Sequence, residues 1–269
     1  MAIITITRNS YSHGKAIAEN VAERLDYRCV GPEIVRQACE QLGVSPLTME
    51  KALQDSPSAL EVFGAEKERH VALFRAAFFD FMKNDNIVYH GLAGHIFLAD
   101  ILNVLKVRVV AKLEDRIQEQ MRRTGDSMVQ AQRRIHDDDE QRRVWTTYLY
   151  GMDSSDPELY DIFVNLNNIR PDKAVQIIVD AARVSTNSHA PQMRKRLADL
   201  ALQAKAEARL LEFFPEVRTS VRDGELFVSV SASMVQEEAV IRKAREALVG
   251  VEGLKAARVG VAAYQYIPF

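Results

Sequence analysis

A glycine and a lysine stand together as Gly14 and Lys15, after a short polar segment that follows an apolar run. A strand that leads through a tight loop into a helix leaves free backbone N–H groups at the positive end of the helix, where phosphate binds. Glycine there allows close backbone approach, and the lysine ammonium reaches phosphate oxygens. The pair therefore indicates a phosphate site, although a helix start with a solvent-exposed lysine has the same spacing.

The complete phosphate-loop pattern, Gly-x-x-x-x-Gly-Lys-Ser/Thr, differs from this segment at two positions. Asn9 stands where the first glycine would be, and Ala16 stands where the hydroxyl residue would be. Because that hydroxyl normally helps to hold magnesium, its absence weakens a metal site more than a phosphate site. Ser10 and Ser12 are the candidate replacements.

Arginines follow in two charged segments, and the second of these, IHDDDEQRR, ends in Arg142 and Arg143. Guanidinium groups match phosphate oxygens in a way that lysine does not. The same segments also place opposite charges four residues apart, which stabilises a solvated helix by a few tenths of a kcal/mol per pair. Ion pairing on one helix is therefore the alternative to phosphate binding, through Arg133 with Asp137, Arg134 with Asp138, Asp138 with Arg142, and Asp139 with Arg143.

The elements that would position these residues alternate between strands and helices. Residues 3–6 are mostly β-branched and unbroken, which is typical of a strand buried on both faces of a parallel sheet. Apolar residues then recur at helical spacing up to Leu25. Further strands are predicted at 87–89, 107–111 and 162–164, and further helices at about 32–42, 61–83, from 113 onward, and 171–183.

A different pattern begins after residues 185–195, which are predicted to form a linker. A helix is expected at about 193–214 and a second at about 235–249, with strands at 217–221, 225–231 and 258–264. Asp223-Gly224 between the first two strands is a strong hairpin signal. The pattern predicts a small α+β module.

Composition limits the classes of function. A chain of 269 residues, 47% hydrophobic, accommodates two domains. With 35 basic and 37 acidic residues its formal charge is −2, so we expect no nucleic-acid partner. Cys29 and Cys39 suit neither a metal motif nor a disulfide framework, and no stretch is long and apolar enough to span a bilayer. The predicted location is the cytoplasm.

The stretch ITITRNSYSHGKAIAENVAERL resembles the opening of the bacterial cytidylate kinase-like proteins. Those usually carry Ser-Arg-Glu, then a Gly-Ser-Gly-Gly loop and an arginine or lysine. Here Thr7-Arg8-Asn9 and Tyr11-Ser12-His13-Gly14-Lys15 occupy the same places, so that two glycines have become Tyr11 and His13. The resemblance continues through VRVVAKLEDRIQEQMRR and IHDDDEQRR and ends at Asn165.

The resemblance implies a P-loop kinase-like α/β domain over residues 1–184, with a parallel sheet flanked by helices. After the 185–195 linker, residues 196–269 form the second, smaller α+β module. ATP and Mg²⁺ are the implied cofactors. Lys15 would contact the donor phosphates, and lid and core arginines would neutralise the transferring phosphoryl group: Arg122, Arg123, Arg142 and Arg143. The candidate nucleotide-binding residues are Arg8, Ser10, Ser12, His13, Gly14 and Lys15.

One departure lies in the segment Tyr89-His90-Gly91-Leu92-Ala93-Gly94-His95, where relatives tend to carry Gly-Arg-Gly or Gly-Arg-Asp on the acceptor side of the cleft. That arginine is absent, which changes the monophosphate specificity or removes phosphorylation. His90 and His95 either line the cleft or simply pack, and their spacing suggests no metal site. Glu33 is either an acceptor-site carboxylate or an acidic residue of a first helical turn.

Residues from about 196 onward resemble a BON-type module through Val221-Arg222-Asp223-Gly224-Glu225-Leu226 and Val249-Gly250-Val251-Glu252-Gly253-Leu254. This resemblance implies a protein or lipid partner rather than catalysis. Two functions are therefore weighed for the whole chain. One is ATP-dependent phosphoryl transfer to a nucleoside monophosphate, and the other is a catalytically degenerate nucleotide sensor or adaptor whose C-terminal module binds a partner.

Overall fold

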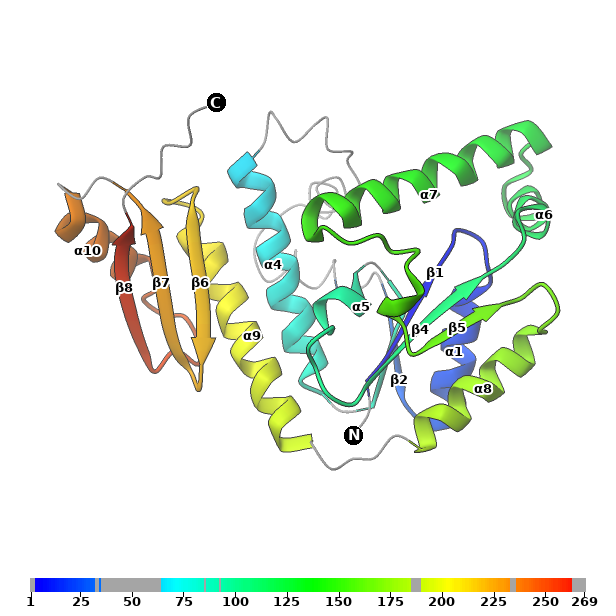
Figure 1. The fold of residues 1–269 in the computed structure, drawn as a ribbon, viewed down its shortest axis with the longest axis horizontal. Helices are drawn as coiled ribbons and strands as arrows, with labels where there is room; N and C mark the ends of the chain where they lie inside the picture. Colours follow the sequence, from blue (N-terminus) through cyan, green and yellow to red (C-terminus); the bar gives the residue numbers. More distant parts are fainter. Residues whose placement is uncertain are drawn as a thin grey trace. The chain divides into compact units, whose positions relative to one another are not determined.

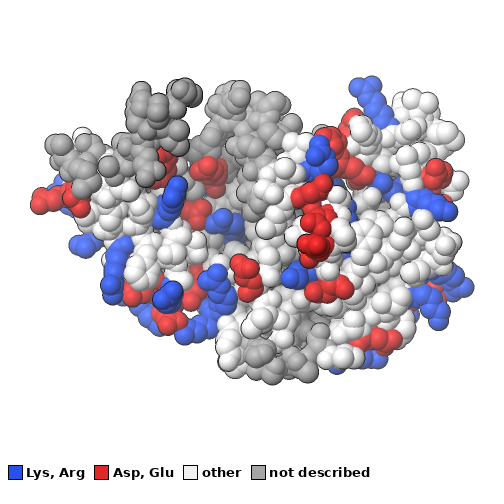
Figure 2. Space-filling view, in the orientation of Figure 1, with Lys and Arg blue, Asp and Glu red and all other residues white. Residues whose placement is uncertain are grey.

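A computed structural model describes residues 3–31, 34, 64–84, 86–91, 93–184, 190–232 and 236–262. Figure 1 shows the fold, which divides into two compact units. Among the described residues, the first unit contains 3–31, 84, 86–91, 93–184 and 190–193, and the second contains 34, 64–83, 194–232 and 236–262. No helix in these ranges is long and apolar enough to cross a membrane. Acidic and basic side chains are interspersed over the visible face (Figure 2).

The first unit is built on a five-stranded parallel sheet with the strand order β2-β3-β1-β4-β5. Ile3 of the central strand pairs with Ile87 on one side and with Val104 on the other. The predicted parallel sheet is therefore confirmed, and the β-branched run at residues 3–6 forms its central strand. The strands are β1 (Ile3–Arg8), β2 (Arg28–Val30), β3 (Ile87–Tyr89), β4 (Val104–Val110) and β5 (Ile162–Asn165).

Two helices, α1 (Gly14–Leu25) and α8 (Pro171–Val184), pack together against this sheet (Figure 1). Their buried side chains, such as Ile17 and Ile178, share one apolar core with Ile4 of β1. The apolar residues that recur at helical spacing after the loop thus face the core. The remaining helices of the unit are α5 (Gly94–Phe97), α6 (Leu113–Thr124), α7 (Met128–Tyr150) and the short 3₁₀ helix Pro157–Leu159.

Parallel strands bring their carboxyl ends to one edge of the sheet, and ligands of open α/β sheets bind there. β1 ends at Arg8 and continues into the loop 9–13, which joins it to α1. β4 ends at Val110 shortly before α6. α6 and α7 therefore follow directly from the edge where the predicted phosphate loop lies.

The second unit holds a three-stranded sheet with the order β6-β7-β8. β6 (Val217–Arg222) and β7 (Glu225–Ser231) are antiparallel, and β7 is parallel to β8 (Ala256–Ala262) across α10 (Glu237–Ala247). Asp223 and Gly224 form the predicted hairpin turn with φ values of 58° and 79°. Because both are positive, the turn fits the twist of the flanking strands. The smaller α+β unit is confirmed.

Two long helices also contribute to this unit, α4 (Gly64–Met82) and most of α9 (Ala190–Leu210). They are joined by ion pairs, with Arg75 Nη2 2.7 Å from Glu207 Oε2 and Lys205 Nζ 2.6 Å from Asp80 Oδ2. Helix α4 thus belongs to the same compact unit as the C-terminal sheet, although it precedes most of the parallel sheet in the sequence. The predicted domain boundaries stay predictions.

Residues 190–195 of the expected linker are helical, because α9 begins at Ala190. A proline as the second helical residue, Pro191, suits such a start. Glu33 and the helix expected at 32–42 lie outside the described residues, except for Ile34.

Candidate functional site

The loop between β1 and α1 keeps a glycine-like backbone without the glycines. Tyr11 and His13 both have φ of 58°, in the left-handed region where a side chain costs about 1 kcal/mol. Gly14 is a position that requires glycine, since an added Cβ would lie 2.4 Å from Cδ of Arg8. No side chain caps the N-terminus of α1. The amides at this end are therefore available to an anion.

The two loop serines differ in their contacts. Ser12 is fully buried, and its hydroxyl donates to the carbonyl of Asn9 at 2.9 Å. Ser10 is 3% exposed, and its hydroxyl has no hydrogen-bond partner among the described residues. Both serines are candidates to replace the hydroxyl missing at Ala16. The hydroxyl of Ser12 is used in a hydrogen bond within the loop, whereas that of Ser10 has no partner among the described residues.

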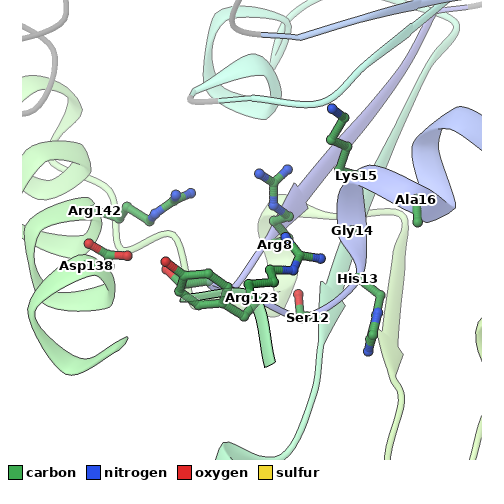
Figure 3. Close-up of a pocket in the computed structure, with 11 residues that line it drawn as sticks. Arg8, Ser12, His13, Gly14, Lys15, Ala16, Arg123, Asp138 and Arg142 are labelled. Carbon is green, nitrogen blue, oxygen red and sulfur yellow. The ribbon is translucent and has the colours of Figure 1, made fainter. Parts of the chain in front are cut away.

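A cavity of about 190 Å³ lies against this loop. Arg8 at the end of β1, Arg123 of α6 and Arg142 of α7 reach it from three elements (Figure 3). Burial, followed by repulsion from Arg142 and Arg123, lowers the pKa of Arg8 to about 10. Three cations that repel one another around one cavity form a site for an anion. Asp138 lines the same cavity, and burial raises the pKa of its carboxyl group.

Lys15 also lines this cavity from the first turn of α1. Its side chain is 64% exposed, and its Nζ lies 3.7 Å from Glu19 Oε1. The predicted ammonium is therefore near the loop but mostly in water. His13 lines the cavity too, although Figure 3 shows its side chain directed away from Arg8 and Lys15.

The four predicted arginines separate into different environments. Arg122 is 72% exposed and forms a two-fold pair with Glu119, and it does not line the loop cavity. Arg123 pairs with the same carboxylate at 2.5 Å and lies 6.0 Å from the ring centre of Tyr11. These pairs hold the pKa of Glu119 at about 2, with Arg122 the largest cause. The side chain of Arg122 thus pairs with Glu119 instead of lining the loop cavity.

Helix α7 is anchored to the loop by Asp139. Ser10 donates its backbone N–H to Asp139 Oδ1 at 3.1 Å, and the carbonyl of Ser10 accepts from Arg116 Nε at 2.7 Å. Arg116, 6% exposed, also pairs with Asp139. Sequence reasoning paired Asp139 with Arg143 instead and missed Arg116.

The other predicted pairs on α7 are partly corrected. Arg133 Nε lies 3.9 Å from Asp137 Oδ2, as expected. Arg134 pairs with Asp126 rather than with Asp138, at 3.6 Å. Arg143 pairs with Glu140 at 2.6 Å, because i,i+3 contacts compete with i,i+4 contacts on a helix surface.

A second cavity of about 170 Å³ adjoins the first, and Arg8 and Arg142 line both. Arg108, 8% exposed, lines the second cavity and donates to Asn9 Oδ1 at 2.9 Å. Arg143 and His95 line it as well, together with the hydroxyl-bearing residues Thr7, Thr146, Ser154 and Ser155. Sequence reasoning missed Arg108, although an arginine inside the apolar run Val107-Arg108-Val109 was the available signal.

His95 lines the second cavity, which agrees with one of the two alternatives for this residue, lining the cleft or packing. Its ring stacks on Tyr160 at 5.0 Å, and its Nδ1 lies 3.0 Å from Thr7 Oγ1. Burial, followed by the positive charges of Arg108 and Lys106, lowers the pKa of His95 to about 4. The imidazole is therefore neutral at physiological pH.

Together the two cavities can hold two anionic groups side by side, with Arg8 and Arg142 between them. This arrangement suits phosphoryl transfer, because that reaction needs the protein to position two phosphate groups and to supply positive charge, and needs little covalent chemistry from the protein.

Comparison with known proteins bears on the same segment. The sequence profile of the cytidylate kinase-like family matches residues 3–168. The cytidylate kinase of Ignicoccus hospitalis is 27% identical over 180 residues, which cover 66% of this chain and 97% of that protein. The cytidylate kinase of Sulfurisphaera tokodaii is 25% identical over 177 residues, covering 65% and 92%.

Among solved structures, an uncharacterized protein from Eubacterium ventriosum shares the fold, with a TM-score of 0.52 and 18% identity over 68% of this chain and 99% of that one.

Proposed function

The chain belongs to the cytidylate kinase-like family, and on this premise we propose that it transfers a phosphoryl group from ATP to a nucleoside monophosphate. The observation that carries the proposal is the pair of adjoining cavities that share Arg8 and Arg142. A family of nucleotide-binding kinases and a site for two neighbouring anions support the same reaction.

In this proposal the donor phosphates lie in the first cavity, against the backbone amides at the start of α1. Lys15 and Arg123 approach them from either side of the loop cavity. The acceptor phosphate lies in the second cavity beside Arg108 and Arg143.

An oxygen of the acceptor phosphate attacks the terminal phosphorus of ATP, the bond to the bridging oxygen breaks, and ADP leaves. Arg8 and Arg142 neutralise the charge of the group in transit.

Magnesium fits this site in the mode in which the nucleotide phosphates supply most of the ligands. Asp138 and Ser10, whose buried hydroxyl has no hydrogen-bond partner among the described residues, line the loop cavity and would hold the ion. The raised pKa of Asp138 is consistent with a carboxyl group buried without a strong cationic partner. When bound, magnesium neutralises the oxygens of the terminal phosphates.

Two arginine variants test the assignment. Arg142→Met removes a guanidinium that lines both cavities, whereas Arg122→Met removes one that is 72% exposed and paired with Glu119. With ATP, magnesium and a panel of nucleoside monophosphates in a coupled assay, we expect Arg142→Met to lower kcat/KM by roughly 10²-fold or more. Arg122→Met should stay within about threefold. Absence of turnover across the panel, or equal losses in both variants, would overturn the proposal.

The BON-like character of residues 196–269 and a protein or lipid partner for that module stay proposals. A mixed sheet packed with α9 and α10 supports the resemblance only in outline. Co-purification with the full chain tests for such a partner.

A further inference from the structure

A buried histidine nitrogen without a partner borders the second cavity. His95 is 3% exposed, and its Nε2 has no hydrogen-bond partner among the described residues. Leaving such a group unsatisfied is unfavourable, so buried polar atoms without a partner call for an explanation such as a bound ligand. His95 is also one of the residues that line the cavity.

The ring of His95 is held on two sides. Thr7 Oγ1 lies 3.0 Å from Nδ1, and the ring of Tyr160 stacks at 5.0 Å. Tyr160 is itself fixed, because its hydroxyl donates to the carbonyl of Ser154 at 2.7 Å and accepts from Arg108 Nη1 at 3.2 Å. These contacts fix the position of the ring and leave Nε2 unused. A site on a fixed ring is preorganised for a contact.

Burial, followed by nearby positive charge, lowers the pKa of this ring and keeps it neutral. Four arginines line the cavity: Arg8, Arg108, Arg142 and Arg143. Asp139 and Asp153 line it as well. Lys106 of β4 adds a further positive charge that acts on the ring. In the tautomer in which Thr7 donates to Nδ1, the neutral imidazole carries its proton on Nε2. In that tautomer Nε2 can donate one hydrogen bond without adding charge to the cationic cavity wall.

We propose that His95 recognises the acceptor, donating from Nε2 to an oxygen of the acceptor's phosphate group in the second cavity. The proposal rests on the proposed function, since that function places the acceptor there. It adds a specificity-determining contact from residues 87–98, a segment that contains no arginine. Arg108, beside it, supplies the charge, and the neutral donor fixes the orientation of the group.

Substitutions separate the two ring nitrogens. In His95→Gln the amide nitrogen can reach the place of Nε2, whereas the shorter amide of His95→Asn reaches only the place of Nδ1, where its oxygen can accept from Thr7. We expect Asn to raise the KM for the monophosphate roughly 10- to 100-fold, as loss of a hydrogen bond to a charged group does. The KM of His95→Gln for the monophosphate should remain within about threefold of the wild-type value. The KM for ATP should change little in either variant.

A packing role predicts a different result, in which stability and both KM values change together and Gln is no better than Asn. Thermal melting of the full chain therefore accompanies the kinetics. Turnover by the wild type with no difference between Asn and Gln would overturn the role of His95 and leave the proposed function standing.

A spectroscopic readout separates failure of the function from failure of the contact. The full chain, labelled with ¹⁵N in histidine, is titrated with CMP and with inorganic phosphate. A shift of the Nε2 resonance of His95, absent in His95→Asn, supports the contact even if no monophosphate is turned over. No shift at saturating CMP would overturn it.

Discussion

Arg116 provides the most direct test of how the phosphate loop is held. Its side chain is 6% exposed, donates to the carbonyl of Ser10 at 2.7 Å and pairs with Asp139, which accepts from the amide of Ser10. In Arg116→Met the carbonyl and the carboxylate both lose this donor. Breaking a buried ion pair costs about 3–5 kcal/mol.

The expected loss is smaller than that limit because Asp139 is 31% exposed and water can solvate its freed carboxylate. We therefore expect the variant to lose about 2–3 kcal/mol of unfolding free energy in the first unit. For a unit of this size that corresponds to roughly 4–12 °C in Tm. Hydrogen exchange of the loop amides should also accelerate, since the loop loses its link to α7.

Arg133→Met is the matched control on α7. Its side chain is 86% exposed and lies 3.9 Å from Asp137, so the change should be below about 0.5 kcal/mol. Differential scanning fluorimetry of both variants, with exchange measured for the peptide that covers the loop, gives the comparison. Equal shifts in the two variants, or an unchanged loop exchange rate in Arg116→Met, would refute the anchoring role.

Two further predictions concern the loop backbone and His95. His13→Gly removes a side chain held at φ of 58°, so relief of strain should offset the entropy of glycine and change stability by less than about 0.5 kcal/mol. Glu19→Gly, inside α1, should lose about 1 kcal/mol, and equal melting losses would contradict the strain argument. The pKa of His95 is lowered to about 4, so the unfolded chain binds more protons between the ordinary value of about 6.5 and 4. The wild type should therefore lose about 3 kcal/mol of unfolding free energy, relative to His95→Gln, as pH falls through this window. Urea denaturation of both proteins at several pH values measures this difference. Midpoints that change equally with pH in the two proteins would contradict the prediction.

The sequence predicted those parts of the fold that depend on short-range patterns. The β-branched run at Ile3 marked the central strand, and Asp223-Gly224 marked the hairpin, because strand burial and positive φ are properties of a few neighbouring residues. The short strand Arg28–Val30 was missed, since three residues with one buried side chain carry little periodicity.

The candidate site could be predicted only in part, because its contacts join distant segments. Arg116 and Asp139 meet at Ser10, which is 106 and 129 residues away from them along the chain. Spacing on a single helix instead suggested local pairs for Asp139. The same limit applies to the arginines, since Arg122 and Arg123 are neighbours in sequence and pair with the same carboxylate, yet only Arg123 lines the loop cavity.

The departures from the phosphate-loop pattern therefore have unequal consequences. Tyr11 and His13 replace glycines but adopt the left-handed backbone, so these changes affect stability more than the shape presented to phosphate. Gly14 is kept at the position where a Cβ would collide with Arg8. Ala16 is different, because no backbone adjustment replaces a missing hydroxyl. The catalytic capacity of this loop should therefore depend on how well Ser10 holds magnesium, more than on its missing glycines.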